Sequence, residues 1–279
     1  MKKICLLPAL IALGAFGAAP PPSEITVSLK LDHDVYVEGE RIRAVVDVAN
    51  ASADNINCWT NNPTDRLVID LYRASDRYQY EPSPKAKFTA PFFLKSGEGQ
   101  KLETFLADNF PFNQNISYFA QAVLIHAGTR YQSRICKFSV VPGMKCGTNP
   151  ALQMFADRDD LRRTFELVHL NRERVEHIFL KAQDEGSSTR RWATTDLGPF
   201  LRVTRPKLSI QPTGEVIVLH RMTQDAFVRS EFWSLPEAFE FHEHEKMLDP
   251  DIAGSERVKE LYKDAGGVEP VKKAWWKFW

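Results

Sequence analysis

The sequence has 279 residues, of which 43% are hydrophobic and 11% aromatic, so it can fill two hydrophobic cores. Its 36 Lys and Arg residues balance 36 Asp and Glu residues, which excludes the strong positive charge typical of nucleic-acid-binding domains. We therefore expect no nucleic-acid partner.

The N-terminus has the layout of a secretory signal peptide. Lys2 and Lys3 precede an apolar run over residues 4–16, and small residues follow it before three consecutive prolines. We expect residues 1–19 to be removed and the mature chain to be exported, to the periplasm or outside the cell. Since no later window holds roughly 20 apolar residues, we expect no transmembrane span.

Alternating apolar residues predict β-strands in the first part of the chain. The expected inward positions are Ile25, Val27, Leu29 and Leu31, then Ile42, Ala44, Val46 and Val48, then Leu67, Ile69 and Leu71, and then Leu102, Thr104 and Leu106. Residues 118–141 read as a hairpin that turns at 127–129, with Cys136, Phe138 and Val140 on the core side. About seven short strands are typical of a β-sandwich.

The opening strands carry a family resemblance. A strand, the sequence DVYVEGERI, and a second strand that ends in VANAS resemble the start of exported bacterial immunoglobulin-like modules, including those of macroglobulin and adhesion type. The resemblance covers residues 23–143. It implies an immunoglobulin-like β-sandwich there and implies no functional residues.

A second β-rich domain is expected over residues 151–248, after a linker at 144–150; the stretch 142–150 contains two prolines and two glycines. Strands are expected at 178–182, 200–204, 207–210, 216–220 and 227–233. Residues 157–168 fit either a short helix or a strand. Residues 249–279 should form a helical appendix, with one helix over 255–264 and an aromatic tail. The predicted class is all-β, with two tandem β-sandwich-like units and this C-terminal helix.

Three cysteines remain beyond the signal peptide, and an exported chain favours their oxidation. Cys136 is expected to face the core, and Cys58 follows the second strand. We therefore predict a Cys58–Cys136 disulfide, with Cys146 as the competing partner of Cys136.

No catalytic or cofactor motif stands out in the sequence, so we expect a non-enzymatic protein with no cofactor. If the segment His242-Glu243-His244-Glu245 formed a strand, two candidate metal ligands, His242 and His244, would project from the same face. Two ligands do not complete a site, and we expect a solvated charged segment instead. The alternative is a secreted hydrolase with a site between the two β units, around His220, His242 and His244.

Aromatic residues give the other route to function, because rigid aromatic faces bind ligands at low entropic cost. The candidate binding aromatics are Tyr78, Tyr80, Phe92, Phe93, Trp275, Trp276 and Trp279. The last three either dock against the folded chain or make peripheral contact with a membrane. The expected role is structural, or the binding of a protein or glycan, in the cell envelope or outside the cell.

Overall fold

The computed structural model describes residues 24–58, 65–82, 91–112, 115–155, 158–185 and 192–248. Apart from the 3-10 helix η1 (Leu106–Asp108), the regular structure in these ranges is β-strand, which confirms the all-β class. These ranges contain no helix that is long and apolar enough to cross a membrane. The predicted signal peptide, C-terminal helix and tail tryptophans (Trp275, Trp276 and Trp279) lie outside them.

Residues 24–143, the first half, contain the strands β1 (Ile25–Leu31), β2 (Val35–Val37), β3 (Arg43–Asn50), β4 (Ile56–Cys58), β5 (Arg66–Arg73), β6 (Gln79–Tyr80), β7 (Phe92–Leu94), β8 (Gly99–Phe105), β9 (Ile116–His126), β10 (Thr129–Gln132) and β11 (Cys136–Val141). One sheet has the order β1-β3-β8. A second, larger sheet has the order β2-β11-β9-β5-β6, with β10 also paired to β9, and β4 and β7 form a small separate pair. The two sheets share one apolar core in a β-sandwich-like arrangement, because each strand turns alternate side chains inward.

The predicted hairpin is confirmed. Strand β9 pairs antiparallel with β10 and then, further along the same chain, with β11. The returning strand is interrupted at Ser133, whose Oγ accepts a hydrogen bond from the backbone N–H of Ala122 at 3.0 Å. Phe138 lies on the buried side, as the alternation predicted, and its ring stacks on that of Tyr118 at 5.4 Å.

Residues 144–248, the second half, contain β12 (Met144–Lys145), β13 (Ala151–Phe155), β14 (Arg158–Arg172), β15 (Val175–Glu185), β16 (Trp192–Pro199), β17 (Lys207–Ile210), β18 (Glu215–Arg221), β19 (Ala226–Ser234) and β20 (Phe239–Leu248). One sheet has the order β12-β14-β15-β16, with β13 on β14, and the other has the order β17-β18-β19-β20. Phe165 and Leu180 from the first of these sheets share a core with Val216 and Phe232 from the second.

The structure resolves one open alternative and departs from several expectations in the second half. Residues 158–172 form a strand, β14, and not a helix. Two of the expected linker residues form β12 and pair with β14. Residues 201–204 form a turn instead of a strand, whereas β16 and the charged strand β20 were not predicted.

The predicted Cys58–Cys136 disulfide is absent, because Cys58, Cys136 and Cys146 are all free thiols. The two cysteines lie in different sheets, Cys58 on β4 and Cys136 on β11. The Cys136 thiol donates instead to the backbone carbonyl of Leu29, at 3.2 Å. Burial raises the pKa of the Cys58 thiol to about 12, so it holds little reactive thiolate at neutral pH.

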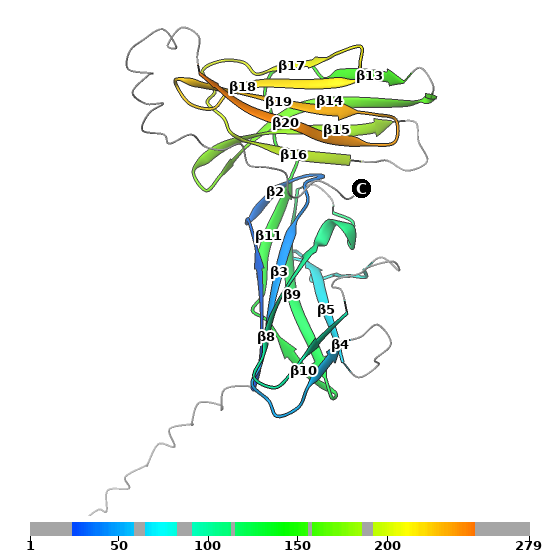
Figure 1. Ribbon diagram of the computed structural model, residues 1–279, viewed down its shortest axis with the longest axis vertical. Helices are drawn as coiled ribbons and strands as arrows, with labels where there is room; N and C mark the ends of the chain where they lie inside the picture. The colour runs from blue at the N-terminus through cyan, green and yellow to red at the C-terminus, as the bar shows by residue number, and fades with distance from the viewer. Residues whose placement is uncertain are drawn as a thin grey trace, which may run out of the picture.

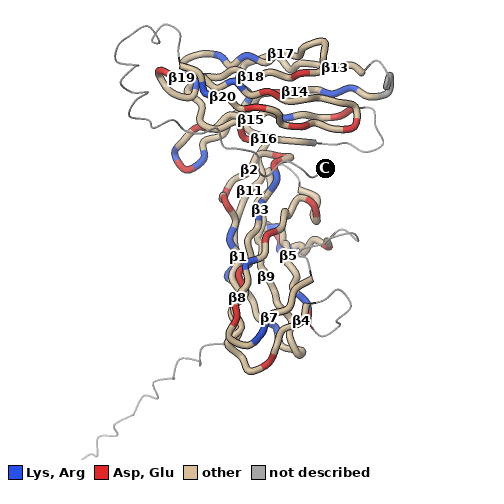
Figure 2. The backbone as a smooth tube through the Cα atoms, viewed as in Figure 1, with Lys and Arg blue, Asp and Glu red and all other residues tan. Residues whose placement is uncertain are grey.

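The two halves are stacked end to end, and the strands of the second half run across those of the first (Figure 1). The loop between β2 and β3 lies against β16, at the point where the halves meet. Lys, Arg, Asp and Glu are scattered over both halves without a region of one sign (Figure 2). This distribution agrees with the balanced composition.

Candidate functional site

A surface hollow lies on the outer face of β5. This strand buries Leu67, Ile69 and Leu71 in the core of the first half. Because successive side chains of a strand point to opposite faces, the intervening Arg66, Val68, Asp70 and Tyr72 face outward. All four line a depression of about 360 Å³. We call it the β5 depression.

The neighbouring strands supply the rest of the β5 depression. Strand β6 pairs with β5 at Leu71 and Tyr72 and contributes Gln79 and Tyr80. On the other side, Ile125 on β9 pairs with both Arg66 and Arg130, so the three side chains form one cross-strand row. The depression therefore combines two guanidinium groups, the Tyr72 side chain, a carboxylate and an amide, and Tyr80 completes its lining.

Asp70 is the polar centre of this arrangement. Its carboxylate accepts hydrogen bonds from Tyr72 Oη, Gln79 Nε2 and Arg130 Nη2, each at 3.4 Å. Hydrogen bonds of this length are weak, so a ligand hydroxyl could replace them at little cost. Partial burial, and then the charge of Asp70, raise the pKa of Tyr72 and keep its hydroxyl protonated as a donor.

The aromatic residues that were predicted from the sequence to bind a ligand lie in different surroundings in the structure. Tyr80 lines the β5 depression and also packs against the core at Tyr118, with ring centroids 5.7 Å apart. Tyr78 is exposed and meets the Tyr80 ring edge-on at 5.2 Å. On β7, Phe92 is buried in the core, and the exposed Phe93 lies beside β4 in a separate sheet.

The polar residues of the depression, Arg66, Asp70 and Arg130, were not predicted from the sequence. The alternation that identified β5 contained a usable signal, because residues between the inward leucines must share the outer face. The pairing with Arg130, on a strand far along the chain, had no such signal.

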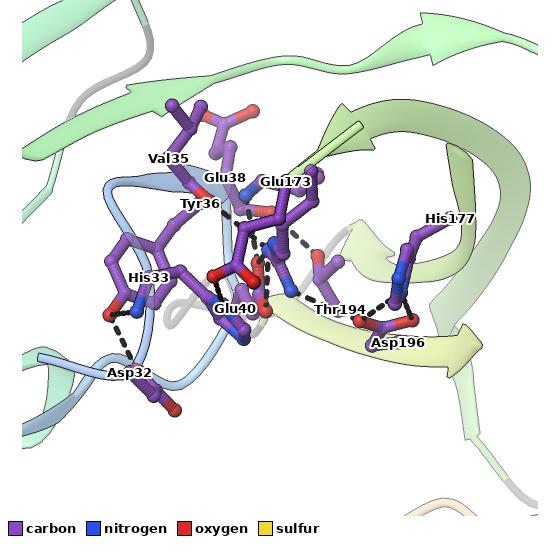
Figure 3. Close-up of polar contacts among 12 residues, drawn as sticks. Asp32, His33, Val35, Tyr36, Glu38, Glu40, Glu173, His177, Thr194 and Asp196 are labelled. Atoms are coloured by element: carbon purple, nitrogen blue, oxygen red, sulfur yellow. Dashed lines mark hydrogen bonds and ion pairs between the residues drawn. The ribbon is translucent and has the colours of Figure 1, made fainter. Parts of the chain in front are cut away.

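A second polar cluster lies where the halves meet (Figure 3). Arg172, at the end of β14, binds both carboxylate oxygens of Glu40 from the first half, at 2.7 and 3.0 Å. Its other terminal nitrogen donates to Asp196 on β16 at 3.0 Å. Asp196 in turn lies 3.0 Å from His177 Nδ1. This cluster links the two halves through a guanidinium group that is almost completely buried.

Further contacts reinforce the junction. Thr194 Oγ1 donates to the backbone carbonyl of Glu38 at 2.6 Å, and Lys181 Nζ contacts the Glu38 carboxylate at 3.2 Å. Val37 packs with Val168 and Phe179 in a small apolar cluster beside these polar groups. Burial raises the pKa of Glu40 to about 7, and the adjacent Arg172 only partly offsets it. The charged groups here bind one another, which suits a structural joint.

The structure brings His220 and His244 of the hydrolase alternative near each other, but not His242. His220 is buried against the ring of Phe200, and burial, followed by the nearby His244, lowers its pKa to about 4. His244 Nδ1 lies 3.0 Å from Ser230 Oγ. A β-bulge separates His242 from this pair, so the expectation that His242 and His244 share one face is wrong.

Comparison with known proteins adds only weak similarity. No protein-family model and no curated protein matches the sequence. Among solved structures, the chain is similar to the sporulation control protein Spo0M from Bacillus subtilis, over 87% of this chain and 97% of that chain. The sequence identity is 10% and the TM-score is 0.29, which is too low to carry an argument about fold or function.

Proposed function

We propose that this is an exported, non-enzymatic binding protein whose ligand is a glycan held in the β5 depression. The observation that carries the proposal is the convergence of Arg66, Asp70, Gln79 and Arg130 beside the Tyr72 side chain in one hollow. A small number of polar groups placed around apolar and aromatic surface is the usual composition of a ligand site.

The chemistry of the depression matches a sugar better than a purely apolar ligand. Sugar hydroxyl groups donate and accept hydrogen bonds, and the depression offers the Asp70 carboxylate as acceptor and the two guanidinium groups as donors. The ring of Tyr72 provides apolar surface for the C–H face of a sugar ring. Two arginines beside one aspartate favour a glycan that carries a carboxylate or another acidic group.

The finer description of the fold belongs to the same proposal. We take the first half as an immunoglobulin-like sandwich and the second half as a smaller unit in tandem with it. Support comes from the two facing sheets of each half, which enclose separate apolar cores. Export rests on the signal-peptide pattern of residues 1–19, and docking of the tail tryptophans stays a prediction.

The hydrolase alternative gains no support from the described residues. The bulge in β20 separates His242 from His220 and His244, and the junction between the halves is filled by ion pairs that satisfy one another. We therefore retain binding as the proposed function.

A carbohydrate microarray tests the proposal, followed by isothermal titration calorimetry with the best acidic oligosaccharide. We expect saturable binding, and we expect Arg66→Ala to weaken it by about tenfold or more, since a charge-assisted hydrogen bond is lost. Arg66 is exposed, so its removal should leave the fold intact.

Arg205→Ala is the matched control, because Arg205 is also exposed but lies in the second half. It should bind the oligosaccharide as tightly as the unmodified protein. Equal losses in both variants would show nonspecific charge attraction. That result, or a peptide ligand that binds where no glycan does, would overturn the proposal.

A further inference from the structure

The outer face of the sheet β17-β18-β19-β20 carries a group of side chains that the β5 depression does not involve. Strand β19 alternates strictly, with Ser230 and Phe232 buried and Arg229, Glu231 and Trp233 on the outer side. Strand β20 pairs with β19 and forms the last strand of the sheet. Side chains paired across these two strands lie on the same face.

A bulge in β20 places two residues, His242 and Glu243, opposite Glu231. Glu231 pairs with Glu243, but the next residue, Phe232, pairs with Phe241, so His242 is an extra residue with no partner. In a regular strand His242 and Glu243 would point to opposite faces. The bulge brings both side chains to the outer face, opposite one residue of the neighbouring strand. Ligand atoms of Glu231, His242 and Glu243 all lie within 4.8 Å of one another.

The surroundings hold two of these three groups in place. The His242 ring meets the edge of the Trp233 ring, with centroids 5.7 Å apart, which restricts its rotation. The Glu231 side chain is only 13% exposed and is paired with Arg229. The cross-strand neighbour of Arg229 is Glu245. When a cation binds Glu231, the Arg229 guanidinium can therefore turn to Glu245 and remain paired.

We infer that Glu231, His242 and Glu243 form a binding site for a divalent transition-metal ion, of which Zn²⁺ is the best match. One imidazole and two carboxylates are ligands that Zn²⁺ accepts in proteins. Mg²⁺ and Ca²⁺ prefer sets made only of oxygen, so the histidine disfavours them. Three protein ligands leave a fourth tetrahedral position for water or for a group from a bound molecule.

Calorimetric titration of the purified, chelator-treated protein with Zn²⁺ tests this inference. We expect one equivalent to bind, and His242→Ala should weaken that binding by about tenfold or more. His244→Ala is the matched control, because His244 lies two residues away but contacts Ser230 on the other face. It should bind Zn²⁺ like the unmodified protein. Equal losses in the two variants, or no saturable binding, would overturn the inference.

Two further measurements keep the test independent of folding. Arg229→Gln removes the cation that competes for Glu231, so it should tighten Zn²⁺ binding, whereas a purely destabilising change would weaken it. Mg²⁺ at the same concentration should give no saturable heat. Weaker Zn²⁺ binding in a folded Arg229→Gln protein, or equal binding of Mg²⁺, would contradict the proposed ligand set.

Discussion

The two halves of the molecule hold themselves together by different means. The core of the first half is built from apolar side chains contributed by facing strands. The second half has a smaller apolar core and also buries charged side chains, among them Arg163, Arg172, Lys181 and Asp184. Burial of charge is costly unless each group is paired, so the second half depends on specific partners as well as on apolar area.

This difference predicts which kind of substitution destabilises each half. An apolar core tolerates replacement by a residue of similar volume, whereas a buried ion pair fails when one partner is removed. Charges of the first half lie mainly at its surface, as in the pair Arg43 and Glu103, whose side chains are 41% and 37% exposed. In the second half the pair Arg163 and Asp184 is 4% and 5% exposed.

The largest effect should follow substitution of Arg163. Its guanidinium donates to both oxygens of Asp184, at 2.5 and 3.1 Å, and also to Ser234 and two backbone carbonyls. Arg163→Met leaves Asp184 buried without its counter-charge, which should lower the free energy of unfolding by about 3–5 kcal/mol. Urea denaturation measures the change. A loss below about 1 kcal/mol would show that the second half does not depend on this pair.

The same contrast explains how far the sequence predicted the structure. Strands β1, β3 and β5 were predicted because each turns every second residue, an apolar one, toward the core, which leaves a visible alternation. Strand β20 was missed because it is an edge strand with charged residues on both faces, which hides the alternation. Strand β16 was missed because its sequence has little alternation. Contacts such as Arg172 with Glu40, which are 132 residues apart, leave no local pattern.

The candidate sites follow the same rule. Tyr80 was recognised as a binding aromatic, but Asp70 was not, because its importance comes from the side chains that converge on it. The bulge at His242 was also invisible in the sequence. It depends on how β20 registers against β19, and a shift of one residue reverses the face of a side chain.

An intermediate effect is expected at the junction, as a dependence of stability on pH. Burial raises the pKa of Glu40 to about 7, above its value in the unfolded chain. The stabilisation that comes from the proton bound to the Glu40 carboxyl is therefore complete below about pH 4.5 and is lost as pH rises through about 7. Glu40→Gln removes the titration. The stability of the unmodified protein relative to this variant should fall by about 3 kcal/mol between pH 5 and 8.

Urea denaturation of the two proteins at several pH values makes this measurement, and subtraction cancels the titration of other groups. The direction in which the relative stability changes with pH is informative in itself. If the relative stability rose with pH, the ion pair of Glu40 with Arg172 would outweigh the cost of burying the carboxylate, contrary to the pKa shift.

The smallest effect is expected from Arg43→Ala in the first half. Arg43 on β3 pairs with Glu103 on β8, and both side chains are well exposed to solvent. Water and salt screen such pairs, so the free energy of unfolding should change by less than about 1 kcal/mol in urea denaturation. The residual effect should shrink further at high salt. A loss as large as that of Arg163→Met would mean that surface ion pairs stabilise the first half as buried pairs stabilise the second, and the contrast between the halves would fail.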